Sequence, residues 1–269
     1  MPLPLSKRRI WWGDFPTAEF EGLDPDSVIA VLPVAAIEQH GPHLPLCTDM
    51  AIMEGMLGEA AARLPDNLDV RILPIQAIGK SKEHLSQPGT LTLDAKVLID
   101  AWTGIGASVA RAGVKKIVFV NSHGGNEEVI GIVTRELRVQ FQMLAVKTSW
   151  QRFGRPEGLF SDLEDRHGIH GGDVETSLML HFRPDLVDMG KAQDFRSNVA
   201  DAEQEFTHLR QTGPHAFAWM ATDLNEHGVV GNAAAATAEK GRLTADYQAA
   251  GFVELLKDVR KARLGEQLR

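Results

Sequence analysis

Short apolar runs alternate along this chain with longer segments of helical spacing, and this alternation constrains the fold more than any other feature. The runs are rich in Val, Ile and Leu, which is typical of strands buried on both faces of a sheet. Each run is too short to form a helix of ordinary length. We expect strands at 28–32, 69–75, 116–120 and 143–148.

The intervening segments carry apolar residues three and four positions apart, which is the spacing of one helix face. Asp94 is a start signal for one of them, and Pro65 and Gly113 are stop signals. We expect helices at 48–64, 94–112, 127–140, 174–182 and 237–263, the last interrupted near Gly241 and Gly251. Alternating strands and helices predict an α/β fold, with a mostly parallel sheet covered by helices on both faces.

The length and composition limit the class of protein. The 269 residues show no linker-like change in composition, so we expect residues 1–269 to form a single domain. Lys and Arg number 28 against 36 Asp and Glu, and this net charge of −8 argues against binding to nucleic acid or to anionic membranes. Cys47 is the only cysteine, which excludes an internal disulfide. With no long apolar run and no signal-peptide core, we expect a cytoplasmic protein without a membrane span.

Three of the expected strands run into dense polar segments, at 38–43, 79–84 and 121–126. Ligands of open α/β sheets bind at the carboxyl ends of the strands. The three segments should therefore meet in one crevice.

Four side chains near these strand ends suit divalent metal ions: Glu38, His40, Asp49 and His123. Carboxylate and imidazole ligands bind Zn²⁺, Mn²⁺ or Fe²⁺. Two such ions about 3.5–4 Å apart can share one carboxylate and hold a hydroxide between them, and Asp49 is the candidate for the shared ligand. Taken singly, Asp49 could instead cap a helix and His40 could be a hydrogen-bonded loop histidine.

The same residues lie in motifs that resemble those of the creatininase (creatinine amidohydrolase) family. The motifs occupy residues 32–49, 121–126, 170–177 and, more weakly, 231–241, and the resemblance extends over about residues 10–260. It implies a three-layer α/β/α sandwich, two divalent metal ions per subunit (Zn or Mn, or Fe), and assembly into homohexamers. It also implies hydrolysis of a small amide, commonly cyclic, by a metal-bridging hydroxide.

The resemblance also implies roles for single residues. Glu38, His40, Asp49 and His123 match the family's metal ligands, with Asp49 bridging. In creatininase proper, a glutamate ligand follows two positions after the histidine equivalent to His123, but this chain has Gly125 there.

Glu175 is the expected replacement for that missing ligand. Its alternative role is an ordinary carboxylate in the first turn of a helix. His170 matches the family's proton shuttle, for which the nearby His167 could compete. We therefore expect His170 and Glu175 to take part in catalysis.

The resemblance also implies that the loop 81–90 reaches the substrate pocket, although it could instead be a turn held by Pro88 and Gly89 with its polar residues facing water. We take Ser81, His84 and Asn126 as candidate substrate-binding residues, although His43 and Asn126 could instead orient metal ligands. Trp150 and Trp219 lie in segments that could reach the pocket, but packing in the core or between subunits is the first expectation for each.

Several functions stay open beside the hydrolysis of a cyclic amide. The same metals could polarise the carbonyl of an oxidised cyclitol or sugar-like ketone, of the 3-dehydro-scyllo-inosose type, for ring opening. Other family members remove a formyl group from a nucleotide precursor or trim a modified peptide. Deformylation needs basic residues for a phosphate, which Lys80, Lys82 and Arg152 could supply. The non-enzymatic alternative is a metal-binding scaffold.

Overall fold

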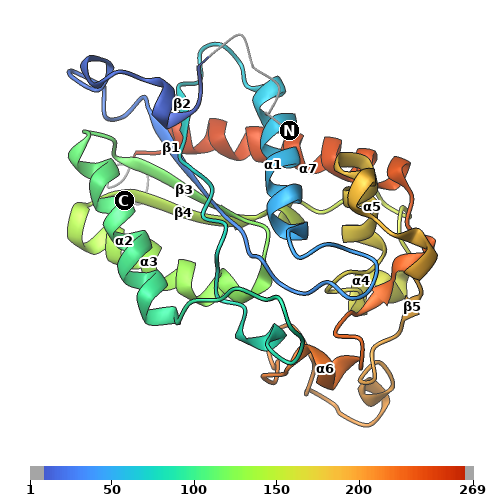
Figure 1. Cartoon of the computed structure of the whole chain (residues 1–269). Helices are drawn as coiled ribbons and strands as arrows, with labels where there is room; N and C mark the ends of the chain where they lie inside the picture. Colours follow the sequence, from blue (N-terminus) through green and yellow to red (C-terminus); the bar gives the residue numbers. More distant parts are fainter. Residues whose placement is uncertain (1–8, 264–269) are drawn as a thin grey trace.

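The computed structural model describes residues 9–263. Its centre is a four-stranded sheet in the order β2-β1-β3-β4 (Figure 1). Every pairing in this sheet is parallel, which confirms the predicted parallel sheet. The strands are β1 (Ile29–Val34), β2 (Val70–Ile72), β3 (Lys116–Asn121) and β4 (Leu144–Ser149).

The second strand is shorter than expected. The prediction covered 69–75, but regular pairing of β2 with β1 ends at Ile72. Pro74 follows two residues later and has no N–H to donate to a neighbouring strand. Beyond Ile72, the Leu73 N–H still donates to the Val31 carbonyl of β1, and an isolated bridge joins Val34 to Gln76.

Helices cover both faces of the sheet, as predicted (Figure 1). Successive residues of β1 belong to opposite cores: Ile29 and Val31 pack with α1 and α7, whereas Ala30 and Leu32 pack with α2 and α3. This follows from the two-residue repeat of a strand. The covering helices are α1 (Thr48–Arg63), α5 (Asp173–Phe182) and α7 (Ala238–Lys261) on one side, and α2 (Ala95–Arg111) and α3 (Glu127–Phe141) on the other.

The predicted interruption of the last helix is wrong, because α7 runs without a break from Ala238 to Lys261. Gly241 and Gly251 instead let α7 pack closely against neighbouring segments. A Cβ on Gly241 would overlap the Ser177 carbonyl of α5, and one on Gly251 would lie 2.8 Å from the Phe153 ring. Glycine is needed here for the neighbours rather than for a bend.

Smaller elements lie beyond the end of β4 and were not predicted. They are α4 (Asp162–His167), α6 (Ala221–Leu224), and an antiparallel pair formed by β5 (Asp194–Phe195) and β6 (Gly231–Asn232). Short 3-10 turns include η3 (Lys82–His84), η4 (Gly124–Asn126) and η5 (Trp150–Phe153). In the described part of the chain, no helix has the length and apolar character needed to cross a membrane.

Candidate metal centre

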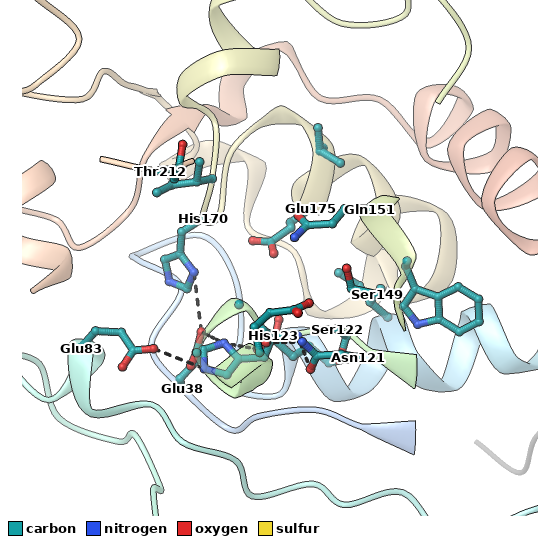
Figure 2. Close-up of a pocket in the computed structure, with 18 of the residues that line it drawn as sticks. Glu38, Glu83, Asn121, Ser122, His123, Ser149, Gln151, His170, Glu175 and Thr212 are labelled. Atoms are coloured by element: carbon teal, nitrogen blue, oxygen red, sulfur yellow. Dashed lines mark hydrogen bonds and ion pairs between the residues drawn. The ribbon is translucent and has the colours of Figure 1, made fainter. Parts of the chain in front are cut away.

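The predicted metal ligands converge at the carboxyl edge of the sheet. Glu38 and His40 lie in the loop after β1, and His123 lies two residues beyond the end of β3. Asp49 and Glu175 lie in the first turns of α1 and α5. All of these side chains except His40 line a pocket of about 700 Å³, part of which is drawn in Figure 2. Elements distant in sequence therefore supply one site, as expected for a parallel sheet.

The ligand atoms fall into two groups that share Asp49. One group contains Glu38, Asp49 and His123, and the other contains His40, Asp49 and Glu175; within each group the candidate atoms lie within 4.8 Å of one another. The two oxygens of Asp49 divide between them, with Oδ1 3.5 Å from His40 Nε2 and Oδ2 3.5 Å from His123 Nδ1. This arrangement is the one a bridging carboxylate requires.

Both histidines are held from behind so that one ring nitrogen faces the carboxylates. His40 Nδ1 donates to the Glu38 carbonyl at 3.1 Å, and His123 Nε2 donates to the Lys80 carbonyl at 2.9 Å. A backbone acceptor of this kind fixes the tautomer and the ring orientation of a metal-binding histidine. His40 Nε2 and His123 Nδ1 are left to face the centre.

The alternative structural roles of two carboxylates are now clear. Asp49 does not cap α1: the cap position is Cys47, and no side chain makes a cap hydrogen bond there. Glu175 does bind backbone, since its Oε2 accepts from the Gly171 N–H at 2.6 Å, and the same oxygen lies 3.7 Å from His40 Nε2.

Crowding of buried charge perturbs every group at the centre. Burial raises the pKa of Asp49, and the nearby Glu38 carboxylate raises it further. Burial also raises the pKa of Glu175, to about 7, despite the attraction of His40. Burial alone would lower the pKa of His40, but the carboxylates, chiefly Asp49, raise it to about 9. Such opposed shifts show several carboxylates competing for too few positive charges.

The donor set fits divalent cations. Within residues 9–263, no hydrogen bond reaches either carboxylate oxygen of Glu38, His40 Nε2 or Asp49 Oδ2, although all four atoms are buried. Burying ionised groups without partners is costly, and a cation among them removes that cost. Mixed carboxylate and imidazole ligands suit Zn²⁺, Mn²⁺ or Fe²⁺.

His170 lies over the centre, between two other imidazoles. Its ring centroid is 4.2 Å from that of His40 and 4.1 Å from that of His84. Nε2 donates to the Gln39 carbonyl at 2.8 Å, and Nδ1 lies 3.6 Å from Glu38 Oε1 (Figure 2). Burial, with the neighbouring imidazoles, lowers the pKa of His170 well below its usual value. His170 is therefore neutral at pH 7, with Nδ1 free to accept a proton.

His167 does not compete with His170 for this position. It lies outside the large pocket and lines a separate cavity of about 40 Å³.

Of the three predicted substrate contacts, only His84 lines the pocket. Ser81 is fully buried behind His123, with its Oγ 3.3 Å from His123 Nε2. Asn126 is also fully buried, and its amide joins the Lys80 N–H to the Ala35 carbonyl. The prediction is therefore wrong for Ser81 and Asn126, because both amino acids hold the framework from its outer side.

His43 acts on the framework as well. Its Nε2 donates to the Gly171 carbonyl at 3.0 Å and lies 3.0 Å from Thr176 Oγ1. This contact fixes the turn between His170 and Glu175.

Much of the pocket wall is formed by residues that were not predicted from the sequence. Glu83 comes within 3.5 Å of His123, and Ser122 and Gln151 line the pocket with part of the segment 212–218. Trp150 and Trp219, whose segments were expected to be able to reach the pocket, line it as well. Lys80 is the only member of the predicted basic set on the wall, and its ammonium pairs with Glu83. The other two members, Lys82 and Arg152, pair with Asp94 and Glu127.

Comparison with known proteins gives a consistent result. The family model described as "Creatininase: Creatinine amidohydrolase" matches residues 14–256. A mycofactocin precursor peptide peptidase from Mycolicibacterium smegmatis is 31% identical over 79% of this chain and 78% of its own. The creatinine amidohydrolase of Pseudomonas putida is 26% identical over 93% of this chain and 97% of its own. A 3-dehydro-scyllo-inosose hydrolase from Thermotoga maritima is 23% identical over 86% and 77%.

Solved structures agree with the sequence relatives. A crystal structure of creatinine amidohydrolase matches with a TM-score of 0.73 and 26% identity, over 96% of this chain and 100% of that one. Two further creatininase structures, described as a Zn-Zn type and a Mn form, are each 25% identical over 93% of this chain and 98% of theirs, with TM-scores of 0.72 and 0.71. The predicted three-layer α/β/α sandwich is thereby confirmed, and the chain belongs to the creatininase family, a family of metal-dependent amidohydrolases.

Proposed function

We propose that this protein hydrolyses an amide C–N bond at a centre of two divalent cations. Glu38, Asp49 and His123 would hold one cation, and His40, Asp49 and Glu175 the other. The single observation that carries the proposal is the sharing of Asp49 between the two ligand groups, with its oxygens facing opposite histidines. The Zn-Zn and Mn forms of related creatininases support zinc or manganese as the ions.

Two cations supply, when bound, a hydroxide at neutral pH and a polarised substrate carbonyl. The chain supplies the proton transfer. His170 Nδ1 faces the centre and is unprotonated at pH 7, while Nε2 is fixed on the Gln39 carbonyl. Nδ1 can therefore take a proton from the attacking water and give it to the departing nitrogen. Glu175 is anchored on the Gly171 N–H through Oε2, and this oxygen also lies 3.7 Å from His40 Nε2, so the anchor holds the carboxylate at the centre.

The pocket favours a substrate larger than a single small ring. Its volume of about 700 Å³ lies within the range of sites that enclose drug-sized ligands. We therefore propose a peptide-like amide, in keeping with the relative named as a precursor peptide peptidase. The carbonyl would lie at the centre, and the rest of the substrate along the wall formed by Gln151 and Trp219.

A small cyclic amide is the second candidate. Trp150 and Trp219 both line the pocket, and indole rings suit a flat ring substrate. Ring opening of a sugar-like ketone would use the same polarised carbonyl. The relative from Thermotoga maritima, which is named as a 3-dehydro-scyllo-inosose hydrolase, supports this alternative. Deformylation of a nucleotide precursor loses support, because every member of the predicted basic set has a carboxylate partner.

We also propose a homo-oligomer, a hexamer by family resemblance. The segment 78–97 carries five large apolar side chains that are at least 40% exposed: Ile78, Leu85, Leu91, Leu93 and Val97. Exposed apolar groups gathered on one segment favour a protein interface. Sedimentation at several protein concentrations tests this, and a monomer at all of them would contradict it.

The metal content of the purified protein tests the centre. We expect close to two Zn, Mn or Fe per chain by elemental analysis. The loaded protein is then assayed on short peptides, cyclic amides and a cyclic ketone. A metal content near zero that added metal cannot raise contradicts the proposal. Bound metal without turnover of any substrate class favours the scaffold.

A further inference from the structure

Glu83 occupies the outer side of His123, where no role was expected for it. It lies in η3, and its side chain is 12% exposed. Oε1 is 3.5 Å from His123 Nε2 (Figure 2). Oε2 accepts from Lys80 Nζ at 2.8 Å. The Lys80 ammonium pairs with this carboxylate, which places a negative charge behind the imidazole.

The imidazole of His123 is thus held from two sides. Nδ1 faces the centre, 3.1 Å from Glu38 Oε1. Nε2 faces outward to the Lys80 carbonyl, Ser81 Oγ and Glu83 Oε1. A carboxylate on the outer nitrogen makes a histidine a more basic ligand and fixes its orientation.

Gly125 is what allows Glu83 to reach this place. A Cβ at position 125 would overlap Glu83 Oε1 and the Lys80 carbonyl, and would lie 2.5 Å from His123 Nε2. The Lys80 carbonyl cannot easily withdraw, because the Lys80 N–H is bound to Asn126 Oδ1 at 2.9 Å. The segment 79–84 can pack against His123 only because position 125 has no side chain.

We propose that Glu83 is a positioning residue of the metal centre, which aims His123 Nδ1 at the cation shared with Glu38 and Asp49. The two positions depend on each other, because the Glu83 carboxylate occupies the space that a side chain at position 125 would fill. The chain lacks a ligand on the glycine side of His123, and it gains a charged support in the same space. This inference rests on the proposed metal centre.

Metal affinity measures the role directly. We expect Glu83→Gln, which keeps the shape and removes the charge, to weaken Zn²⁺ binding by about 10–100-fold in competition with a chelator. Glu83→Asp keeps the charge but moves it away from His123, because the side chain is one methylene shorter. Its Zn²⁺ affinity should therefore fall between those of Glu83→Gln and the wild type. Glu128→Gln is the matched control, because Glu128 is an exposed carboxylate on the same pocket wall. It should change Zn²⁺ affinity by less than about two-fold.

The NMR signal of the His123 imidazole distinguishes a positioning role of Glu83 from a general contribution to the stability of the fold. In ¹⁵N spectra of the zinc-loaded protein, the Nε2–H of His123 should change shift in Glu83→Gln and remain in place in Glu128→Gln. Wild-type Zn²⁺ affinity in Glu83→Gln would overturn the inference, and so would equal losses in both variants. Failure of the wild type to bind Zn²⁺ or Mn²⁺ would instead overturn the proposed function.

Discussion

The pocket has two walls built in different ways. The inner wall carries the proposed ligands, which sit just beyond strand ends or in first helical turns; Glu38, His40, Asp49 and His123 are each 5% exposed or less. The outer wall includes Thr212, Gly213, Ala216 and Ala218, which belong to no regular element and are all exposed. The proposed ligands thus lie on or beside rigid elements, and the proposed substrate-facing surface lies on loops.

This difference has a physical basis. A metal site requires several atoms to be placed within a few tenths of an ångström, which packed strands and helices provide. A recognition surface needs variety more than rigidity, and loops tolerate change without loss of the core. Substitutions on the inner wall should therefore affect metal binding and rate, and those on the outer wall should affect the choice of substrate.

The largest effect is expected from Asp49→Asn. The change removes one negative charge from both ligand groups, so both cations should be weakened and turnover should fall about 10³-fold or more, since several kcal/mol of charge stabilisation is lost. Elemental analysis beside a rate assay checks this. Two tightly bound ions in the variant would show that Asp49 does not bridge.

His170→Gln should separate chemistry from metal binding. Gln can still donate to the Gln39 carbonyl but cannot carry the proton, so turnover should fall about 10²–10⁴-fold with metal content unchanged. Pre-steady-state rates on the loaded variant are the measurement. Normal turnover on the true substrate would remove His170 from the mechanism, and loss of metal would make it a ligand.

Trp219→Ala tests the outer wall. Trp219 is half-buried, lines the pocket, and donates to the Gln211 carbonyl at 2.9 Å. We expect KM for a peptide substrate to rise about 10-fold, in line with a lost contact of about 1–2 kcal/mol, while metal content stays the same. Phe206→Ala, an exposed aromatic in the same region, is the control. Loss of metal in Trp219→Ala would contradict the division between the walls.

The smallest effect concerns acid stability. Burial lowers the pKa of His43 to about 4 from an unfolded value near 6.5. The unfolded chain therefore binds this proton first, and stability contributed by neutral His43 is lost as pH falls from about 6.5 to 4. In His43→Gln, the slope of unfolding free energy against pH in that window should fall by at most about 1.4 kcal/mol per pH unit. Urea unfolding of the metal-free protein measures it, with His215→Gln, at an exposed histidine, as control; an unchanged slope would contradict the assignment.

Much of the fold could be predicted from local patterns. The apolar runs of β1, β3 and β4 and the apolar spacing of α1, α2 and α3 are local properties, and each was found within a few residues. The unbroken α7 was not, because its glycines are required by α5 and Phe153, which are distant in sequence. The short β5 and β6 have only two residues each, too few to leave a pattern.

The site divides in the same way. Residue type and position after a strand were enough to propose Glu38, Asp49 and His123, because the ends of parallel strands must meet at one edge. Ser81 and Asn126 were misplaced, since a polar side chain near the site can face either the pocket or the framework behind it. Only packing shows which side it faces.

The sequence by itself therefore determined the parallel sheet, the edge that carries the chemistry and the kinds of ligand, since these depend on periodicity and residue chemistry. The tertiary structure decided the rest. It divided the ligands into two groups around Asp49, left His170 Nδ1 free by binding its Nε2, and placed Glu83 against Gly125. Most of these contacts join segments distant in sequence, such as Gln39 with His170 and Glu83 with His123, and no local pattern encodes a distance between such segments.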